Sequence, residues 1–217
     1  MPGYQVRKLD VQVGAYQYRI RALKDHLQFT DPNGKARRAG ICSASWSLFG
    51  QLWPASQVLA KAVKRIHIDN RKIIELGCGL GLPSLLLKSR GADITASDHH
   101  PLSEPFLTYN STLNKLPPIP YIDLPWDTQQ EVGRFDLIIG SDILYQRNHA
   151  QLLTSLIENI AAKRSKVLIT CPGRGYRNIF SRSLRAQGFE LKTTRMAFTD
   201  TDKAPYRGRL LTYTRGL

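Results

Sequence analysis

The chain has 217 residues, of which 42% are hydrophobic, and this is enough for one domain with a sizeable core. This composition excludes a wholly disordered chain, and no apolar run approaches the ~18 residues that a membrane-spanning helix needs. The N-terminal residues MPGYQVRKLD lack the apolar core of a secretion signal, so we expect a cytoplasmic protein that does not contact membranes. Cys42, Cys78 and Cys171 lack paired metal spacing and predict neither a disulfide framework nor a zinc site.

Positive charge is in excess, because 31 Lys and Arg residues against 17 Asp and Glu residues give a formal net charge of +14. Such a surface can attract polyanions, so we expect an acidic protein partner, with nucleic acid as the alternative. A basic surface that contacts only solvent is the simpler interpretation. The cations cluster in three stretches, GKARR (34–38), GRGYRNIFSRSLR (173–185) and YRGRLLTYTR (206–215).

The first 52 residues are predicted to form an N-terminal β-hairpin extension. Apolar and polar residues alternate in QVGAYQYRIRAL (12–23), as in a half-buried strand, and DPNGK (31–35) contains strong turn residues. A helix is expected next, over WPASQVLAKAVKRI (53–66), with Pro54 in its first turn. The rest of the chain, 53–217, is predicted to be a single domain.

That domain is predicted to be an α/β fold, because strands and helices alternate along it. Strands are expected at 72–76, 93–97, near 119–122, at 135–141 and at 166–171, and helices at 82–90, 102–115, 149–163 and up to about Gln187. This alternation indicates a doubly wound, mainly parallel sheet with helices on both faces. Strands at 189–198 and 208–214 have no helix between them, so we expect an antiparallel C-terminal ending.

A glycine-rich loop follows the first of these strands in RKIIELGCGLGLPSLLLKSRGADITASD (71–98). Gly77, Gly79 and Gly81 allow a sharp turn and a close approach of the backbone to a ligand, at the edge where parallel sheets bind ligands. Asp98 ends the next strand, where a carboxylate can accept hydrogen bonds from both hydroxyls of a ribose. The alternative is that the glycines serve only a structural turn.

The loop favours S-adenosylmethionine over a dinucleotide. A dinucleotide fingerprint requires a third glycine where this chain has Leu82. Glu75 precedes the loop, and its carboxylate would repel a pyrophosphate but suits the ammonium and sulfonium of S-adenosylmethionine. We therefore expect S-adenosyl-L-methionine as the cofactor.

Four stretches give the chain a family resemblance: LWPAS (52–56), ELGCGLGLPSL (75–85), LPW (124–126) and FDLIIGSDILY (135–145). With them the chain resembles class I S-adenosylmethionine-dependent methyltransferases and, more narrowly, the seven-β-strand lysine methyltransferases, or methyltransferase family 16. The resemblance implies a Rossmann-like, doubly wound, seven-stranded sheet over residues 53–217. It also implies a cofactor site made of Trp53 over the pocket, Glu75, Gly77, Gly79 and Gly81 at the amino-acid portion, Asp98 at the ribose, His99 and Trp126 at the adenine, and Ser141.

The resemblance further implies that Asp142 and Tyr145, a D-x-x-Y motif, line a channel for the substrate lysine. A lysine ammonium has a pKa of ~10.4 and must lose a proton before it attacks, and a nearby carboxylate would raise that pKa. Asp142 is therefore expected to orient the amine rather than to act as the base, and Tyr145 to hydrogen-bond the nitrogen and attract the cation. The alternative is that Asp142 caps the following helix and Tyr145 packs in its first turn.

The predicted function is S-adenosylmethionine-dependent methylation of lysine in a protein. RNA methylation is an alternative because of the net charge, although no Asn or Asp followed by Pro-Pro and an aromatic, the pattern of base-amino methylation, follows the fourth strand. A non-catalytic protein that binds the cofactor or an acidic partner is the other alternative.

His99 and His100 lack a third ligand at recognisable spacing, so a metal is not expected. Trp126 is also compatible with simple core packing.

Overall fold

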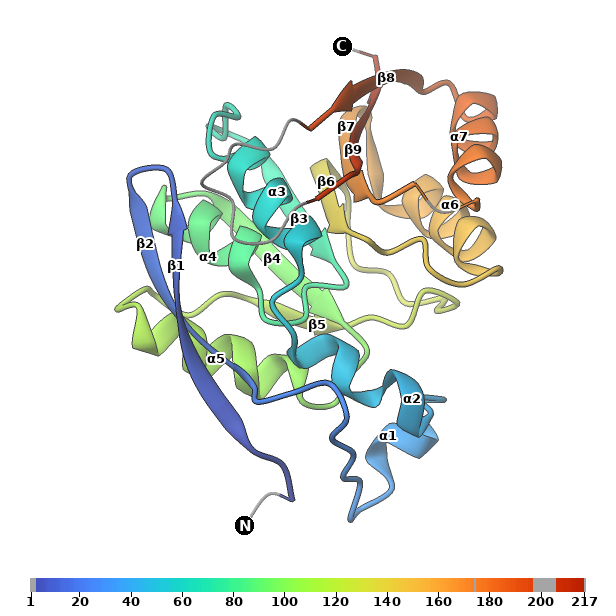
Figure 1. Cartoon of the computed structure of the whole chain (residues 1–217). Coiled ribbons are helices and arrows are strands. Elements are labelled where there is room, and N and C mark those ends of the chain that lie inside the picture. Colours follow the sequence, from blue (N-terminus) through green and yellow to red (C-terminus); the bar gives the residue numbers. More distant parts are fainter. Residues whose placement is uncertain (1–2, 174, 197–205, 217) are drawn as a thin grey trace.

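The structure, a computed structural model, describes residues 3–173, 175–196 and 206–216. Its centre is a seven-stranded sheet in the order β5-β4-β3-β6-β7-β9-β8, and a two-stranded hairpin lies beside it (Figure 1). The strands are β1 (Val6–Val13), β2 (Tyr16–Leu23), β3 (Lys72–Leu76), β4 (Asp93–Asp98), β5 (Tyr121–Asp123), β6 (Phe135–Ser141), β7 (Ala161–Cys171), β8 (Glu190–Arg195) and β9 (Arg209–Arg215). The helices are α1 (Lys35–Arg38), α2 (Ser43–Trp46), the short 3-10 helix η1 (Ser47–Gly50), α3 (Pro54–Val63), α4 (Leu82–Ser89), α5 (Ser103–Leu113), α6 (His149–Ile160) and α7 (Arg177–Ala186).

The sheet confirms the predicted fold class. The strand pairs from β5 to β7 are parallel, whereas β9 runs antiparallel to both of its neighbours, β7 and β8. Strand order reverses at β3, with β4 on one side and β6 on the other, so a crevice forms at its carboxyl end.

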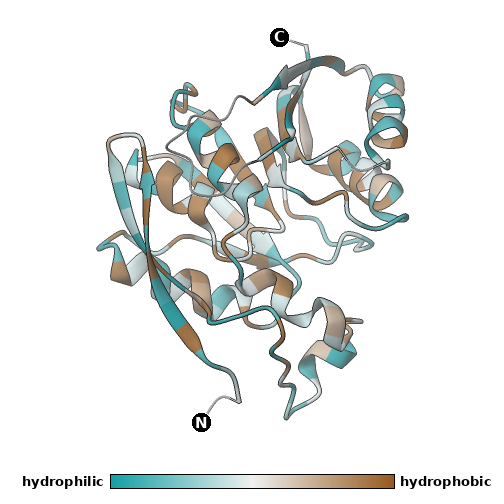
Figure 2. Cartoon of the chain, viewed as in Figure 1, coloured by the Kyte–Doolittle hydropathy of each residue, from teal (hydrophilic) through white to brown (hydrophobic). Residues whose placement is uncertain are grey.

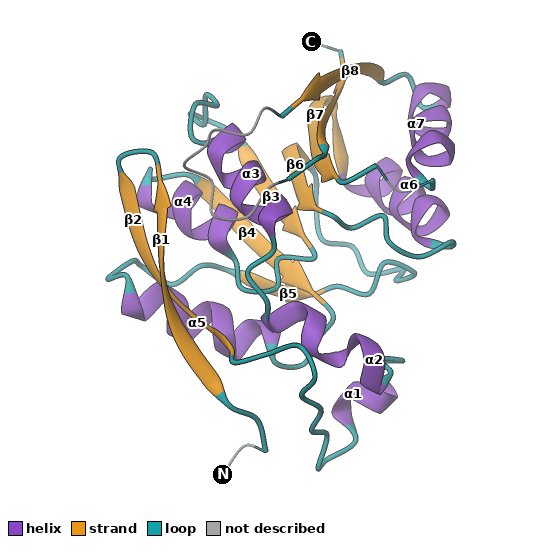
Figure 3. Cartoon of the chain, viewed as in Figure 1, coloured by secondary structure: helices purple, strands orange, loops and turns teal. Residues whose placement is uncertain are grey.

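Helices cover both faces of the sheet (Figure 3). Consecutive residues Ile73 and Ile74 of β3 are both fully buried, each in a different hydrophobic cluster, because side chains alternate between the faces of a strand. The first cluster packs α3, α4, α5 and the hairpin on one face, and the second packs α6 and α7 on the other. Such strands contain continuous apolar runs, as expected for a doubly covered parallel sheet.

The hairpin β1-β2 reverses direction at Gly14 and Ala15, whereas the strong turn residues at 31–35 have another role. There the carboxylate of Asp31 accepts hydrogen bonds from the backbone N–H groups of Ala36 and Arg37, at 3.0 and 2.9 Å, and so stabilises α1. The turn predicted at DPNGK is present, since Gly34 N–H donates to the Asp31 carbonyl at 3.0 Å, and it leads into α1 rather than joining β1 to β2.

Two asparagines of α5 and its C-cap join the hairpin to the domain. The side-chain oxygens of Asn110 and Asn114 accept hydrogen bonds from the backbone N–H groups of Arg21 and Arg19, at 2.7 and 2.8 Å. Figure 2 shows the hairpin as mostly hydrophilic, with a few hydrophobic stretches. Ile20 of β2 belongs to the hydrophobic cluster that the hairpin shares with the sheet. The boundary at residue 52 stays a prediction, and the hairpin packs into the same core as the sheet.

Several predicted boundaries differ from the structure. The helix predicted over 149–163 ends at Ile160, because Ala161 pairs with Phe135 at the start of β7. The helix predicted over 53–66 ends at Val63. The strand predicted over 189–198 is present as β8 as far as Arg195, and its last two residues lie outside the described part of the chain. Among the described helices, none has the length and apolar character needed to cross a membrane.

Candidate active site

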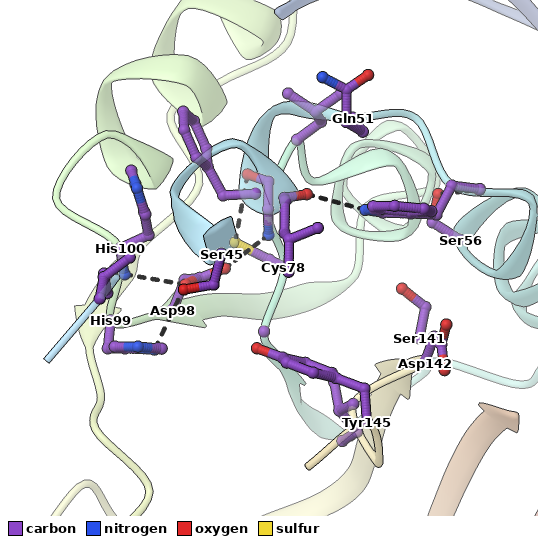
Figure 4. Close-up of a pocket in the computed structure, with 18 of the residues that line it drawn as sticks. Ser45, Gln51, Ser56, Cys78, Asp98, His99, His100, Ser141, Asp142 and Tyr145 are labelled. Atoms are coloured by element: carbon purple, nitrogen blue, oxygen red, sulfur yellow. Dashed lines mark hydrogen bonds and ion pairs between the residues drawn. The ribbon is translucent and has the colours of Figure 1, made fainter. Parts of the chain in front are cut away.

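A cavity of about 440 Å³ opens at the carboxyl ends of β3, β4 and β6. It is lined by all of the predicted site residues except Glu75: Trp53, Gly77, Gly79, Gly81, Asp98, His99, Trp126, Ser141, Asp142 and Tyr145. In Figure 4, Asp98 and His99 lie on one side of the cavity and Ser141 and Asp142 on the other, with Tyr145 between them. Its volume is typical of a site for a small-molecule cofactor.

The three glycines of the loop all have a positive φ, between 51° and 76°. A Cβ on Gly79 would lie 2.7 Å from the carbonyl oxygen of Phe49, and one on Gly81 would lie 2.3 Å from a methyl carbon of Leu107. A Cβ on Gly77 would face Ile143 and Trp126, at 3.1 and 3.4 Å. The loop therefore needs glycine both for its turns and for the protein segments that pack against it.

Asp98 is held rigidly at the end of β4. One carboxylate oxygen accepts a hydrogen bond from Gly79 N–H at 2.9 Å, and the other accepts one from His100 N–H at 3.0 Å. Each carboxylate oxygen offers two acceptor sites, so both oxygens can still accept a hydrogen bond from a ligand in the cavity. The Asp98 carboxylate is thus fixed in position, and both of its oxygens can still accept hydrogen bonds from a ligand.

Glu75 lies behind the loop and is fully buried. Its Oε2 accepts hydrogen bonds from the backbone N–H of Ser84, at 3.0 Å, and from the Ser84 hydroxyl, in the first turn of α4. Its Oε1 has no hydrogen-bond partner among the described residues. Burial raises the pKa of Glu75 to about 8, against the opposing effect of the bonds from Ser84.

Aromatic rings form one wall of the cavity. The Trp126 ring meets His149 edge-on at 4.7 Å between centroids, and His149 meets Tyr145 in the same way at 4.4 Å. His99 lies 6.5 Å from Trp126 and 3.9 Å, between ring nitrogen and carboxylate oxygen, from Asp98. Trp53 is half exposed at the rim, where its indole N–H donates to the carbonyl of Leu48 at 2.8 Å.

Asp142 has a left-handed backbone conformation, with φ 51°, which is uncommon outside glycine and best tolerated by Asn and Asp. Its backbone N–H donates to the carbonyl of Thr170 in β7 at 2.8 Å. Helix α6 begins at His149 after Asn148, with no side-chain cap, so Asp142 does not cap it. Burial and the carboxylates of Asp98 and Asp142 raise the pKa of Tyr145 to about 12, so its hydroxyl stays protonated.

The sequence reasoning missed the residues that the segment 40–51 contributes to the cavity. Ile41, Ser45, Leu48, Phe49 and Gln51 all line it. The ring of Phe49 stacks on His100 at 3.9 Å, and burial lowers the pKa of that histidine to about 4. The aromatic run SWSLFGQLW (45–53), directly before LWPAS, is the signal that could have identified this wall.

His149 was also missed. Its Nδ1 lies 2.9 Å from the carbonyl of Ile143, inside the D-x-x-Y segment, and burial lowers the pKa of its ring. A neutral ring can donate from Nδ1 to that carbonyl, so His149 holds the segment in place. Within the described part of the chain, no three His, Cys, Asp or Glu side chains gather at a spacing that fits a metal.

Comparison with known proteins gives a family. The model of a family described as lysine methyltransferase matches residues 43–183. Protein N-lysine methyltransferase METTL21A of Danio rerio is 28% identical over 156 residues, which cover 66% of this chain and 69% of that protein. The electron transfer flavoprotein beta subunit lysine methyltransferase of Mus musculus is 32% identical over 155 residues. These cover 67% of this chain but 56% of that protein, so the chain spans little more than half the length of that relative.

Solved structures share the fold. The 16S rRNA N2 G1207 methyltransferase RsmC of T. thermophilus, in complex with AdoMet and guanosine, has a TM-score of 0.68 at 17% identity. The match covers 97% of this chain and 51% of RsmC. The ribosomal protein L11 methylase of Lactobacillus delbrueckii subsp. bulgaricus has a TM-score of 0.60 at 17% identity and 98% coverage of both chains. The first enzyme is named for an RNA and the second for a protein, so the fold does not identify the acceptor.

Proposed function

Because the chain belongs to the lysine methyltransferase family, we propose that it transfers a methyl group from S-adenosylmethionine to a lysine side chain of a partner protein. The family match confirms the predicted family, the methyltransferase class and the cofactor. One observation carries the proposal of a lysine acceptor: a single cavity joins the glycine loop and Asp98 to Asp142 and Tyr145.

The cofactor half of the cavity fits S-adenosylmethionine. Asp98 keeps free acceptor positions for two ribose hydroxyls, Trp126 and His99 offer ring faces and edges for the adenine, and the glycine loop brings bare backbone to the amino-acid portion. Glu75 lies behind the loop, its Oε1 has no hydrogen-bond partner among the described residues, and a cation bound nearby would favour its ionised form and lower its raised pKa. The bound cofactor supplies a methyl group on a cationic sulfur.

The acceptor half positions the amine. Asp142 accepts a hydrogen bond from the lysine ammonium, and the Tyr145 hydroxyl donates to or accepts from the same nitrogen, while its ring attracts the cation. Ser141 and Trp53 line the approach to this point. The ammonium proton leaves to water before attack, and the aromatic wall then excludes water from the aligned nitrogen. The chain's own residues thus act by orientation.

The proposal includes a protein partner with an acidic surface and a cytoplasmic location. The net charge of +14 supports the first, and the free thiols of Cys42, Cys78 and Cys171 support the second.

Transfer of labelled methyl from S-adenosylmethionine into a cell lysate tests the proposal. We expect label in a protein that survives nuclease, disappears with protease and yields methyl-lysine on hydrolysis. Label that disappears with nuclease alone would instead indicate an RNA acceptor. A chain that binds S-adenosylmethionine but labels neither class would be a binding protein.

A further inference from the structure

A second hollow, of about 350 Å³, lies between α7 and the β8-β9 pair, and arginines dominate its lining. Arg177, Arg182 and Arg185 come from α7, and Arg209 comes from the start of β9. We call it the arginine groove. Figure 1 shows α7 beside the end of the sheet at which β9 and β8 lie.

The described residues of the arginine groove offer its cations no acidic counterpart. None of the described residues that line it is acidic, and the four arginines form no ion pair with any described residue. Arg182 and Arg185 are exposed and lie three positions apart on one helix, a spacing at which like charges repel. The repulsion between these clustered charges destabilises the folded chain, and an anion bound in the groove would reduce that repulsion.

The lining of the arginine groove is polar as well as cationic, because it includes the hydroxyl group of Ser181. The Ser181 hydroxyl, in its lining, lies 2.8 Å from the Tyr213 hydroxyl of β9. Burial raises the pKa of Tyr213 to about 12, while Arg177 and Arg185 act in the opposite direction. Ser181 and the four arginines of the lining can donate hydrogen bonds to one anion, whereas the Tyr213 hydroxyl is fully buried and is not among the lining residues.

The arginine groove starts at the same edge of the sheet as the active site. Asp142 is bonded through its N–H to Thr170 near the end of β7, and the next residue, Cys171, is the register partner of Arg209. Arg209 in turn pairs with Arg195 in β8. Because neighbouring strands are about 4.8 Å apart, Arg209 lies roughly two strand spacings from the end of β6.

We propose that the arginine groove binds an acidic segment of the protein that carries the acceptor lysine. This inference rests on the proposed function, because it assumes a protein acceptor. Arginine guanidinium groups bind carboxylates through two parallel hydrogen bonds, and four of them suit a run of Asp or Glu side chains. Single-stranded nucleic acid would also need aromatic platforms for its bases, and the described lining of the arginine groove has no aromatic residue.

Fluorescence anisotropy of the full chain with a fluorescein-labelled deca-glutamate peptide tests the proposal. We expect binding that weakens with salt, and a loss of at least tenfold in affinity in the double variant Arg182→Gln/Arg185→Gln. Both residues are exposed, so the variant should fold. Arg37→Gln/Arg38→Gln in α1 is the matched control, because it removes the same charge from exposed positions of another basic cluster and should keep the affinity. Equal losses in both variants, or no binding at all, would overturn the proposal.

Two further measurements separate the outcomes. Tighter binding of a fluorescein-labelled deca-uridylate, lost in the groove variant only, would assign the arginine groove to nucleic acid and overturn the proposal. In the lysate assay, the groove variant should label protein at least fivefold more weakly than the control variant. Equal labelling by the groove variant and the control variant would overturn the proposal for the arginine groove and leave the proposed function intact. If the unaltered chain labels no protein, the proposed function fails, and the peptide affinities alone then decide whether the groove binds carboxylates.

Discussion

The two halves of the main cavity are held in place by different means. In the cofactor half, backbone groups hold the site. Glycines with positive φ form the loop, and the N–H groups of Gly79 and His100 donate hydrogen bonds that fix Asp98. In the acceptor half, the segment from Asp142 to Tyr145 is held mainly by side chains, through the contacts of His149 with Ile143, Tyr145 and Trp126. A half that is held by backbone groups needs glycine and aspartate at fixed positions. A half that is held by side-chain packing can accept other residues, and with them another acceptor molecule.

Gly79→Ala would test whether the cofactor half is independent of the N-terminal segment. The alanine would have to keep the left-handed φ of Gly79, and its Cβ would lie 2.7 Å from the Phe49 carbonyl oxygen. We therefore expect a loss of about 2–5 kcal/mol in the free energy of unfolding in urea. Gly91→Ala is the control, because its φ is 80° and nothing lies within 4 Å of the new Cβ. It should cost about 1–2 kcal/mol. Equal losses would mean that Phe49 does not constrain the loop.

Glu75→Gln would test the buried support behind the loop. Burial raises the pKa of Glu75 to about 8 from an ordinary value of 4.5, so the folded protein binds a proton that the unfolded chain releases. This stabilisation is complete below pH 4.5 and is lost as the pH rises through 8, a fall of roughly 3 kcal/mol between pH 5 and pH 8. We expect the unfolding free energy of the unaltered protein to fall by that amount relative to Glu75→Gln. Parallel curves would show that the carboxyl is already ionised at pH 5.

Asp142→Asn would test whether the halves can be separated. Asparagine tolerates the left-handed φ but removes the charge that we propose orients the amine, so we expect methyl transfer to protein to fall about 100-fold. Affinity for S-adenosylmethionine, measured by calorimetry, should stay within about threefold. A parallel loss of cofactor affinity would mean that Asp142 belongs to both halves.

His149→Phe would test the packing of the acceptor half. Phenylalanine keeps a ring beside Trp126 and Tyr145 but leaves the carbonyl of Ile143 without its donor, and we expect a loss of about 1–2 kcal/mol in urea. His149→Asn is the converse variant, since it keeps a donor and loses the ring. If only His149→Asn is destabilised, the ring and not the hydrogen bond holds the segment.

That the glycine loop and Asp98 line one cavity could be predicted from sequence, because they lie close together in the chain. The loop from Glu75 to Gly81 and the carboxylate of Asp98 follow from one strand, one turn and the next strand. The wall from 40–51 was missed, because the aromatic run 45–53 does not by itself show that Phe49 reaches the cavity, which it does through tertiary packing against His100. The end of α6 was missed for a similar reason: residues 161–163 have no helix breaker, and only pairing with Phe135 makes them a strand.

The position of β9 bears on the order in which the sheet can assemble. The last strand of the described residues, β9 (Arg209–Arg215), lies between β7 and β8, which precede it in the chain. Until it is synthesised, β8 has no neighbour to pair with and β7 presents an unpaired edge, which is a template for association with other chains. Removal of these seven residues would leave both β7 and β8 with an unpaired edge. We therefore expect a chain truncated before β9 to aggregate during synthesis.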